Sequence, residues 1–203
     1  MPDKTLIASI SGIRGIFGSG LSPDVLVQFA SAFASWCVET NGGGTAVVVG
    51  RDARVTGELC SRIVTGTLAA AGLDVIDAGL ATTPTVEMAV IEEKAGGGIV
   101  LSASHNPGEW NALKLLNDRG EFLSPEQGAR VLQLAEEGAD PTVGHQMIGT
   151  FGQRDYLDHH IDAILGLPFV DPEEIRTRGF RVLVDGVNSV GGIAIPRLLK
   201  RLG

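Results

Sequence analysis

The sequence predicts an α/β fold built on a mixed, mostly parallel sheet. Short apolar runs at residues 46–49, 75–77 and 99–101 indicate buried strands, and segments with helical spacing and helix caps separate them. Strands that alternate with helices are typical of a layered domain with a parallel sheet. A further apolar run at residues 111–116 follows a turn and can return antiparallel, so we expect the sheet to be mixed.

The chain begins with a predicted strand at residues 6–10 and a loop at residues 11–20, which contains four glycines and a single cation, Arg14. Glycine lets backbone N–H groups approach an anion closely, and the guanidinium group of Arg14 offers a planar fork to a phosphate. A flexible surface loop with a solvated arginine is the alternative interpretation.

Helices are predicted to cover the sheet. The first spans residues 22–40, with Ser22 as its cap and Pro23 at its first position. Cys37 and Cys60 lie in apolar helical surroundings, which favours buried free thiols. The first helix carries a core stripe of Phe29, Phe33, Trp36 and Cys37, and further helices are expected up to about residue 71, at 82–94 and at 124–137.

The predicted strand at residues 46–49 ends in a charged segment. Arg51, Asp52 and Arg54 follow it directly. These side chains could bind an anion or pair with one another. A structural ion network at the end of a strand is the interpretation that we favour.

The strand at residues 99–101 stops in the run Ser102-Ala103-Ser104-His105-Asn106-Pro107. Proline biases the preceding residue away from helix, and in α/β folds ligands bind at this edge of a sheet. Ser104 next to His105 suggests a nucleophile or a hydroxyl that carries phosphate, with an ordinary polar turn as the alternative. Lys114 lies among leucines in the next predicted strand, where it needs a partner, and an anion at Ser104 could be that partner.

Three motifs together resemble the N-terminal part of the α-D-phosphohexomutases, a family that includes phosphoglucomutase, phosphomannomutase and phosphoglucosamine mutase. They are Ser-Gly-Ile-Arg-Gly at residues 11–15, Gly-Arg-Asp-Ala-Arg at residues 50–54, and the serine run followed by Asn111 and Lys114. The third motif resembles the phosphoserine loop of the family. Ser102 stands where the family usually has threonine, and Ala112 where it usually has glycine.

The resemblance implies a three-layer α/β/α sandwich followed by the start of a second, similar domain. It implies that Ser104 is phosphorylated, passes its phosphate to a hexose phosphate and takes the other phosphate back from the hexose bisphosphate. Arg14 and Lys114 would bind substrate, neutralise phosphate charge and converge on Ser104, and Lys114 is also a candidate to move a proton. His105 would orient the loop or the sugar, and Asn106 would shape the turn.

Mg²⁺ is the cofactor that the resemblance implies, held by a phosphate oxygen on Ser104 and by an aspartate-rich loop further along the family's chain. No Asp-x-Asp-x-Asp pattern occurs in this sequence. We therefore expect an N-terminal fragment that folds but does not turn over, with missing C-terminal domains as its partners. The expected parts are a phosphoserine domain at 1–152, a connecting helix and linker at 153–179, and a truncated second domain at 180–203. The first part ends in a loop without a strong pattern at residues 138–152, and the connecting helix spans residues 156–165. The truncated domain opens with a strand at 180–185 and ends in an apolar helix.

Composition argues against two other classes of partner, nucleic acid and membrane. A formal net charge of −8 disfavours nucleic acid, although a few focused cations can still bind a small phosphosugar. No apolar run reaches the ~18 residues of a membrane span, and the first residues lack the pattern of a signal peptide, so we expect a cytoplasmic protein. His145 is expected to be solvated, and the adjacent His159 and His160 make a poor metal pair.

Two other classes of function remain open. A hydrolase could use Ser104 with His105, although adjacent residues seldom form the required hydrogen bond and no Gly-x-Ser-x-Gly pattern surrounds the serine. A non-catalytic phosphosugar-binding or scaffold domain is the stronger alternative, because the chain lacks the metal loop. Glucose, mannose and glucosamine phosphates all remain possible substrates.

Overall fold

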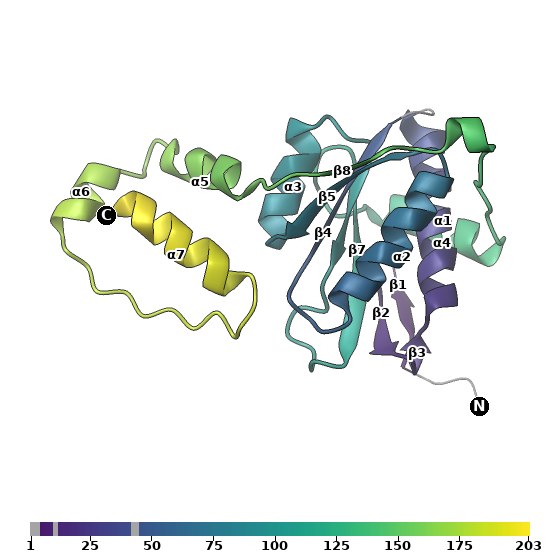
Figure 1. The fold of residues 1–203 in the computed structure, drawn as a ribbon, viewed down its shortest axis with the longest axis horizontal. Helices are drawn as coiled ribbons and strands as arrows, with labels where there is room; N and C mark the ends of the chain where they lie inside the picture. The colour runs from purple at the N-terminus through teal and green to yellow at the C-terminus, as the bar shows by residue number, and fades with distance from the viewer. Residues whose placement is uncertain (1–4, 10–11, 42–44) are drawn as a thin grey trace.

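The structure, a computed structural model, describes residues 5–9, 12–41 and 45–203. Within them, one eight-stranded sheet has the order β1-β2-β7-β6-β4-β5-β8, with β3 paired to β2. Figure 1 shows helices on both sides of this sheet. The strands are Ile7–Ser9 (β1), Gly12–Phe17 (β2), Gly20–Leu21 (β3), Ala46–Arg51 (β4), Asp74–Leu80 (β5), Gly97–Leu101 (β6), Trp110–Leu116 (β7) and Phe151–Gln153 (β8).

The sheet is mixed, as the sequence predicts. The pairs β2–β3, β4–β5, β4–β6 and β5–β8 are parallel, whereas β1–β2, β2–β7 and β6–β7 are antiparallel. Strand β7 returns antiparallel because only a short turn joins it to β6, and a parallel return needs a crossover of a dozen residues or more.

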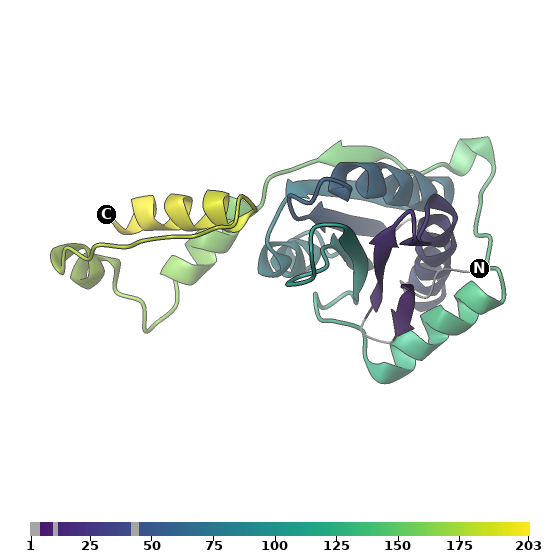
Figure 2. The same ribbon diagram turned by 90° about the horizontal axis from the view of Figure 1, so that it is seen from below.

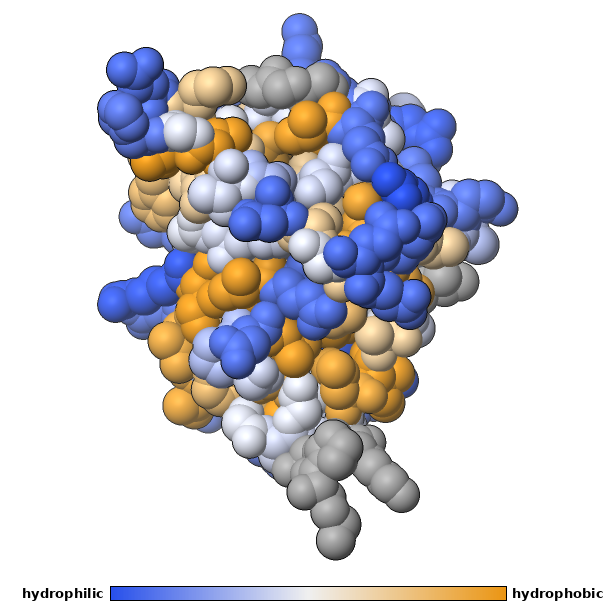
Figure 3. Space-filling view, turned by 90° about the vertical axis from the view of Figure 1, so that its right-hand side faces the viewer, coloured by the Kyte–Doolittle hydropathy of each residue, from blue (hydrophilic) through white to orange (hydrophobic). Residues whose placement is uncertain are grey.

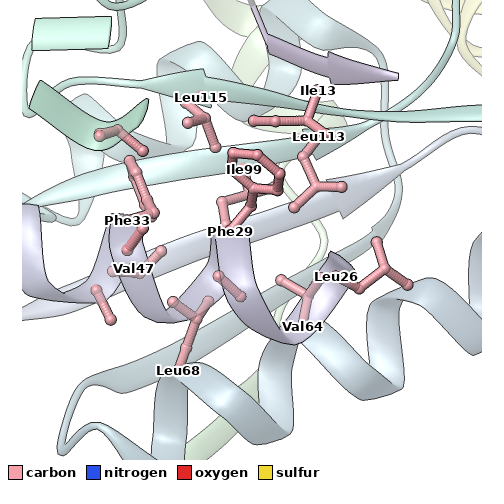
Figure 4. Packing of buried hydrophobic residues seen from close by; sticks show 14 of the residues in the cluster. Ile13, Leu26, Phe29, Phe33, Val47, Val64, Leu68, Ile99, Leu113 and Leu115 are labelled. Atoms are coloured by element: carbon pink, nitrogen blue, oxygen red, sulfur yellow. The ribbon is translucent and has the colours of Figure 1, made fainter. Parts of the chain in front are cut away.

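Two hydrophobic cores lie on opposite faces of the sheet and make the three layers. Helices α1 (Pro23–Asn41), α2 (Gly57–Ala70) and α4 (Pro125–Glu136) pack on one face, and α3 (Thr83–Glu92) packs on the other. Val47 and Val49 of β4 enter the first core and Val48 enters the second, because successive side chains of a strand point to opposite faces. Figure 4 shows Phe29 and Phe33 of α1 against Val47 and Ile99 in the larger core.

The predicted helix starts are confirmed by their caps. Ser22 Oγ accepts from the backbone N–H of Val25 at 3.3 Å. Thr82 caps α3, and Ser124 forms a capping box with Gln127 at the start of α4. Each side-chain oxygen satisfies a backbone donor that has no partner within its helix.

Strand β2 corrects the expectation of a loop at residues 11–20. Residues 12–17 are a strand, while Ser11 and the end of the predicted strand at residues 6–10 lie outside the described residues. The strand forms because β1 and β7 pair with it on its two sides. Gly12 allows the close approach, since a Cβ atom there would lie 2.5 Å from the carbonyl oxygen of Leu113.

The remaining helices form an arm to one side of the sheet (Figures 1 and 2). They are α5 (Leu157–Leu165), α6 (Pro172–Thr177) and α7 (Gly191–Leu202). The predicted helices at both ends of this arm are confirmed, and α6 lies within the expected linker, where Asp171 caps it.

Two expectations about the later part of the chain are wrong. Residues 180–185 contain no strand, because no neighbouring strand offers them hydrogen bonds. The patternless loop expected at residues 138–152 contains a short 3₁₀ helix (His145–Met147) and the start of β8. Strand β8 continues to Gln153, one residue past the domain boundary expected at residue 152, and that boundary stays a prediction.

The surface shown in Figure 3, on the side of α1 and α4, carries hydrophilic and hydrophobic residues in alternation rather than in two separate fields. In the part of the chain that the structure describes, no helix combines the length and apolarity that a bilayer crossing needs.

Candidate functional site

Ser104 lies in the turn that follows the end of β6. Its side chain is exposed, and its backbone has φ 55°, in the left-handed region. That conformation costs a residue other than glycine about 1–2 kcal/mol, so the surrounding contacts must hold it. Locally, the Ser104 N–H donates to Ser102 Oγ at 3.2 Å and the Asn106 N–H donates to the Ala103 carbonyl at 3.0 Å.

Arg14 and Lys114 lie on the same face of the sheet. In the antiparallel pair β2–β7, Arg14 lies opposite Ala112, and Lys114 is two residues further along β7. Directly opposed residues share a face, as do residues two apart on a strand. The β6–β7 register places Val100 opposite Lys114, so Ser102, two residues after Val100, continues on this face toward Ser104.

We call the surface around Arg14, Lys114 and Ser102 the open face, because α3 packs mainly over β4 and β6 on this side of the sheet. Arg14 is exposed, and Lys114 and Ser102 are half-buried. Diagonal neighbours on adjacent strands are about 7–8 Å apart, which two long cationic side chains can span. Whether both charged groups reach Ser104 stays a prediction.

Lys114 has two neighbours that constrain it. Its Nζ lies 6.0 Å from the centre of the Phe122 ring, within reach of a cation–π attraction. Burial raises the pKa of the Glu87 carboxyl on α3, and the positive charge of Lys114 partly offsets that shift. The open face therefore combines two fixed cations with one carboxyl that protonates more readily than usual.

The ion pairing predicted at the end of β4 is confirmed for Asp52 and Arg54, whereas Arg51 Nη1 donates to the backbone carbonyl of Asp52 at 3.4 Å. Arg54 Nε lies 3.1 Å from Asp52 Oδ2, and only 10% of the Arg54 side chain and 17% of the Asp52 side chain are exposed. The other four N–H groups of Arg54 donate to the carbonyls of Ser104, Asn106, Pro107 and Trp110 at 2.6–2.9 Å.

This contact between Arg54 and the Ser104 turn was not predicted. The available signal was the adjacency of two parallel strands, β4 and β6, whose carboxyl ends meet at one edge of the sheet. Asn106 shapes the turn as expected, through its backbone rather than its side chain.

Asn111, the next residue of the serine motif, is fully buried and structural. Its amide donates to Thr56 Oγ1 at 3.0 Å, and its Oδ1 accepts from the backbone N–H of Ala112 at 2.8 Å. Both cysteines are free and buried, as predicted, and burial raises the pKa of the Cys60 thiol to about 11. Burial also raises the pKa of Cys37, so neither thiol is a nucleophile at neutral pH.

The histidines do not assemble into a metal site. His105 and His145 are exposed. His160 shares a hydrogen bond of 2.9 Å with Thr85, whereas His159 faces Glu92 at 3.9 Å, so the adjacent pair diverges as expected.

Mg²⁺, the expected cofactor, finds few ligands here. Among the described residues no group of three or more histidine, cysteine, aspartate or glutamate side chains could hold a metal ion. A phosphate on Ser104 would supply one oxygen ligand, whereas Mg²⁺ prefers octahedral coordination. The residues present do not fit a complete site for the ion, and no step described below depends on it.

Comparisons with known proteins agree with this architecture. Residues 6–141 match the model of the phosphoglucomutase/phosphomannomutase alpha/beta/alpha domain I. The chain is 36% identical to a phosphoglucomutase/phosphomannomutase of Thermococcus kodakarensis, covering 95% of this chain and 42% of the relative. It is 30% identical to a phosphoglucosamine/phosphogalactosamine mutase of Sulfurisphaera tokodaii, over 95% and 41% of the two chains.

A crystal structure of a phosphoglucomutase/phosphomannomutase family protein from Burkholderia thailandensis has a similar fold. The TM-score is 0.74 at 27% identity, with 97% of this chain and 42% of that chain covered. The chain thus spans about two-fifths of the length of the relatives it matches. With two thirds of its residues matching the first-domain model, the chain belongs to the phosphoglucomutase/phosphomannomutase family of isomerases.

Proposed function

We propose that this chain is the phosphate-carrying N-terminal part of a phosphohexomutase, which interconverts hexose 1-phosphates and 6-phosphates. One observation supports this most directly: Ser104 is exposed in the turn after β6, beside a face of the sheet that carries Arg14 and Lys114. A phosphoserine carries about −1.5 to −2 charges at pH 7, so it needs cations nearby.

The proposed reaction uses Ser104 Oγ as the carrier. A free hydroxyl of a hexose phosphate bonds to the phosphorus as the bond between phosphorus and Ser104 Oγ breaks, and the hydroxyl proton passes to Ser104 Oγ. The resulting hexose bisphosphate reorients in the site. Ser104 Oγ then bonds to the phosphorus of the other phosphate and gives up its proton to the sugar oxygen that is released. The phosphoseryl group is regenerated, and the sugar leaves with its phosphate on the other carbon.

The chain's own residues supply charge neutralisation and positioning, which carry most of the catalysis of phosphoryl transfer. Arg14 offers a planar fork to phosphate oxygens, held by a strand that is paired on both sides. Lys114 supplies a point charge and, with the Glu87 carboxyl near it, is the candidate to move the hydroxyl proton. His105, exposed in the turn, is the candidate to orient the sugar.

Mapping the phosphate tests this proposal. The complete reading frame is expressed, incubated with a hexose 1,6-bisphosphate and digested, and the phosphopeptide is sequenced. Phosphate is expected on Ser104 and lost in Ser104→Ala, while the matched variant Ser102→Ala retains it. Phosphate on Ser102 in the unmodified protein would overturn the assignment. Assays with glucose, mannose and glucosamine phosphates then identify the sugar.

A non-catalytic phosphosugar-binding or scaffold role is the second candidate, favoured by the lack of a metal cluster among the described residues. The intact mass of the longer protein, measured with and without the bisphosphate, separates the two, because a scaffold gains no covalent phosphate. The hydrolase alternative has less support, since within the described part of the chain no hydrogen bond joins the side chains of Ser104 and His105.

A further inference from the structure

We propose that Arg54 is a positioning residue that fixes the phosphate-carrying turn through its backbone. A guanidinium group has five N–H donors, and in Arg54 each of the five makes a hydrogen bond. Nε donates to Asp52, Nη1 donates to the carbonyls of Pro107 and Trp110, and Nη2 donates to those of Ser104 and Asn106. That the turn carries phosphate on Ser104 rests on the proposed function. The hydrogen bonds of Arg54 to the turn do not depend on that proposal.

Asp52 holds the guanidinium group in the required plane. Its Oδ2 accepts from Arg54 Nε at 3.1 Å, and its Oδ1 accepts from the Arg54 backbone N–H at 3.0 Å. The Asp52 N–H donates to the carbonyl of Leu101, the last residue of β6, at 3.1 Å. The two residues are thus anchored to the strand from which the Ser104 turn departs.

The turn needs such a cation because four of its carbonyls converge on one place. Their negative ends repel one another unless a donor with several N–H groups lies between them. The Ser104 carbonyl is one of the four, so the contact acts directly on the residue whose backbone is in the left-handed region. Fixing both ends of this peptide fixes the direction in which Ser104 Oγ leaves the backbone.

Lysine cannot replace arginine in this role. A lysine ammonium has three donors and no planar fork, so it cannot satisfy four carbonyls and one carboxylate together. Because no N–H group of Arg54 remains free, the side chain has no donor left for a sugar or a phosphate. Its loss should therefore reduce the rate of transfer without weakening substrate binding.

Amide hydrogen exchange on the 203-residue chain tests the structural half of the inference. In Arg54→Lys, the peptide covering residues 102–110 should exchange roughly tenfold faster, while peptides from β4, β6 and α2 keep their rates. Asp52→Asn should give a smaller change in the same peptide. Arg62→Lys is the matched control, since Arg62 is exposed and pairs only with Glu58 on its own helix. Unchanged exchange at 102–110, or an equal rise throughout the sheet, would overturn the inference.

Phosphoryl transfer in the complete reading frame tests the functional half. Displacing a reacting group by about 1 Å can cost about 100-fold, so kcat in Arg54→Lys should fall by that order while KM for the hexose phosphate stays constant. A raised KM with unchanged kcat would instead make Arg54 a substrate-binding residue and overturn the inference. Absence of phosphate on Ser104 in the unmodified protein would refute the proposed function, and the exchange experiment would still decide the role of Arg54.

Discussion

The sheet region (residues 5–153) and the C-terminal arm (residues 154–203) are stabilised in different ways. In the sheet region, every residue of β6 is buried, and large side chains from α1, α2 and α4 fill the core on one face. In the arm, Leu157, Ile161 and Ala194 form one small buried cluster, while Tyr156 packs into the smaller core of the sheet region.

Exposed ion pairs also join α7 to α5 and to the residue two positions before it. Arg197 pairs with Asp155 at 2.9 Å and also with Asp158, and Arg201 pairs with Asp162 at 2.6 Å. Exposed ion pairs contribute little, typically below 1 kcal/mol. We therefore predict that the first region folds by itself, whereas the second has apolar side chains that nothing in the described chain covers, among them Leu183 at 98% exposure.

The largest expected effect concerns turnover. We predict that the 203-residue chain shows only background mutase activity with glucose, mannose and glucosamine phosphates, because the sheet region offers a carrier and two cations but no complete metal site. The complete reading frame, assayed in parallel, is the control. Turnover by the shorter chain at a comparable rate would show that the site is complete without further domains.

The second-largest expected effect is that of a core substitution, which should show that the sheet region depends on buried apolar side chains more than the arm does. Phe33 is fully buried, so Phe33→Ala should lower the free energy of unfolding of the sheet region by about 3–5 kcal/mol through lost transfer energy and a residual cavity. Urea denaturation followed by circular dichroism measures it. Leu183→Ala in the arm is the control and should leave the midpoint in place; a similar shift in both variants would remove the distinction.

The ion pairs of the arm should matter less. Arg197→Ala removes the ion pairs with Asp155 and Asp158 and should weaken the docking of α7 only slightly, because both pairs are exposed to solvent. Amide exchange in α7 should accelerate accordingly, and high salt should narrow the difference from the parent because it screens exposed charges. Acceleration in β4 or β6 would show that the arm supports the sheet as well.

The smallest expected effect is a dependence on pH where the arm meets the sheet region. Burial, with a smaller contribution from His159, lowers the pKa of His160, which bonds Thr85 at the start of α3. A lowered folded-state pKa means that the stabilisation is complete above the unfolded pKa of about 6.5 and is lost as pH falls through the folded value. The protection factors of the α5 amides, which correct for the intrinsic pH dependence of exchange, should thus fall as the pH is lowered from 7 to 5.5.

Two substitutions show which histidine causes the pH dependence in α5. His160→Asn should remove the pH dependence in this window, whereas His159→Asn should keep it, because His159 is more exposed and only approaches Glu92. Protection factors in α5 of the parent protein that do not change between pH 7 and 5.5 would contradict the prediction.

Sequence reasoning located the elements whose signals are local. The apolar runs of β4, β6 and β7 and the capped starts of α1, α3 and α4 are visible in short windows. Strand β2 was missed because two glycines interrupt its apolar pattern and because one of its partners, β7, lies far away in the chain. Strand β8 was missed because all three of its residues are exposed, as on the edge of a sheet. The strand expected at residues 180–185 had the right residues but no partner.

The residues of the site also fall into those with a local sequence signal and those that depend on distant contacts. Ser104, Arg14 and Lys114 were proposed from motifs, and the registers of β2, β6 and β7 explain how the two cations share a face. The contacts of Arg54 could not be foreseen, because they link residues about 50 positions apart through backbone carbonyls, which no residue pattern encodes. Side-chain identity predicts chemistry, whereas backbone contacts require the fold.

The placement of β2 has a consequence for the order of assembly. Ser104 lies in the turn between β6 and β7, and Lys114 lies in β7, so they can meet early, whereas Arg14 must wait for Ala112 to be synthesised. At about 5–20 residues per second, the ribosome needs roughly 5–20 s for the intervening segment. During that time β2 has no β7 to pair with, and closing so long a loop is slow. We therefore expect the carrier turn to form first and its arginine to be the last component to arrive.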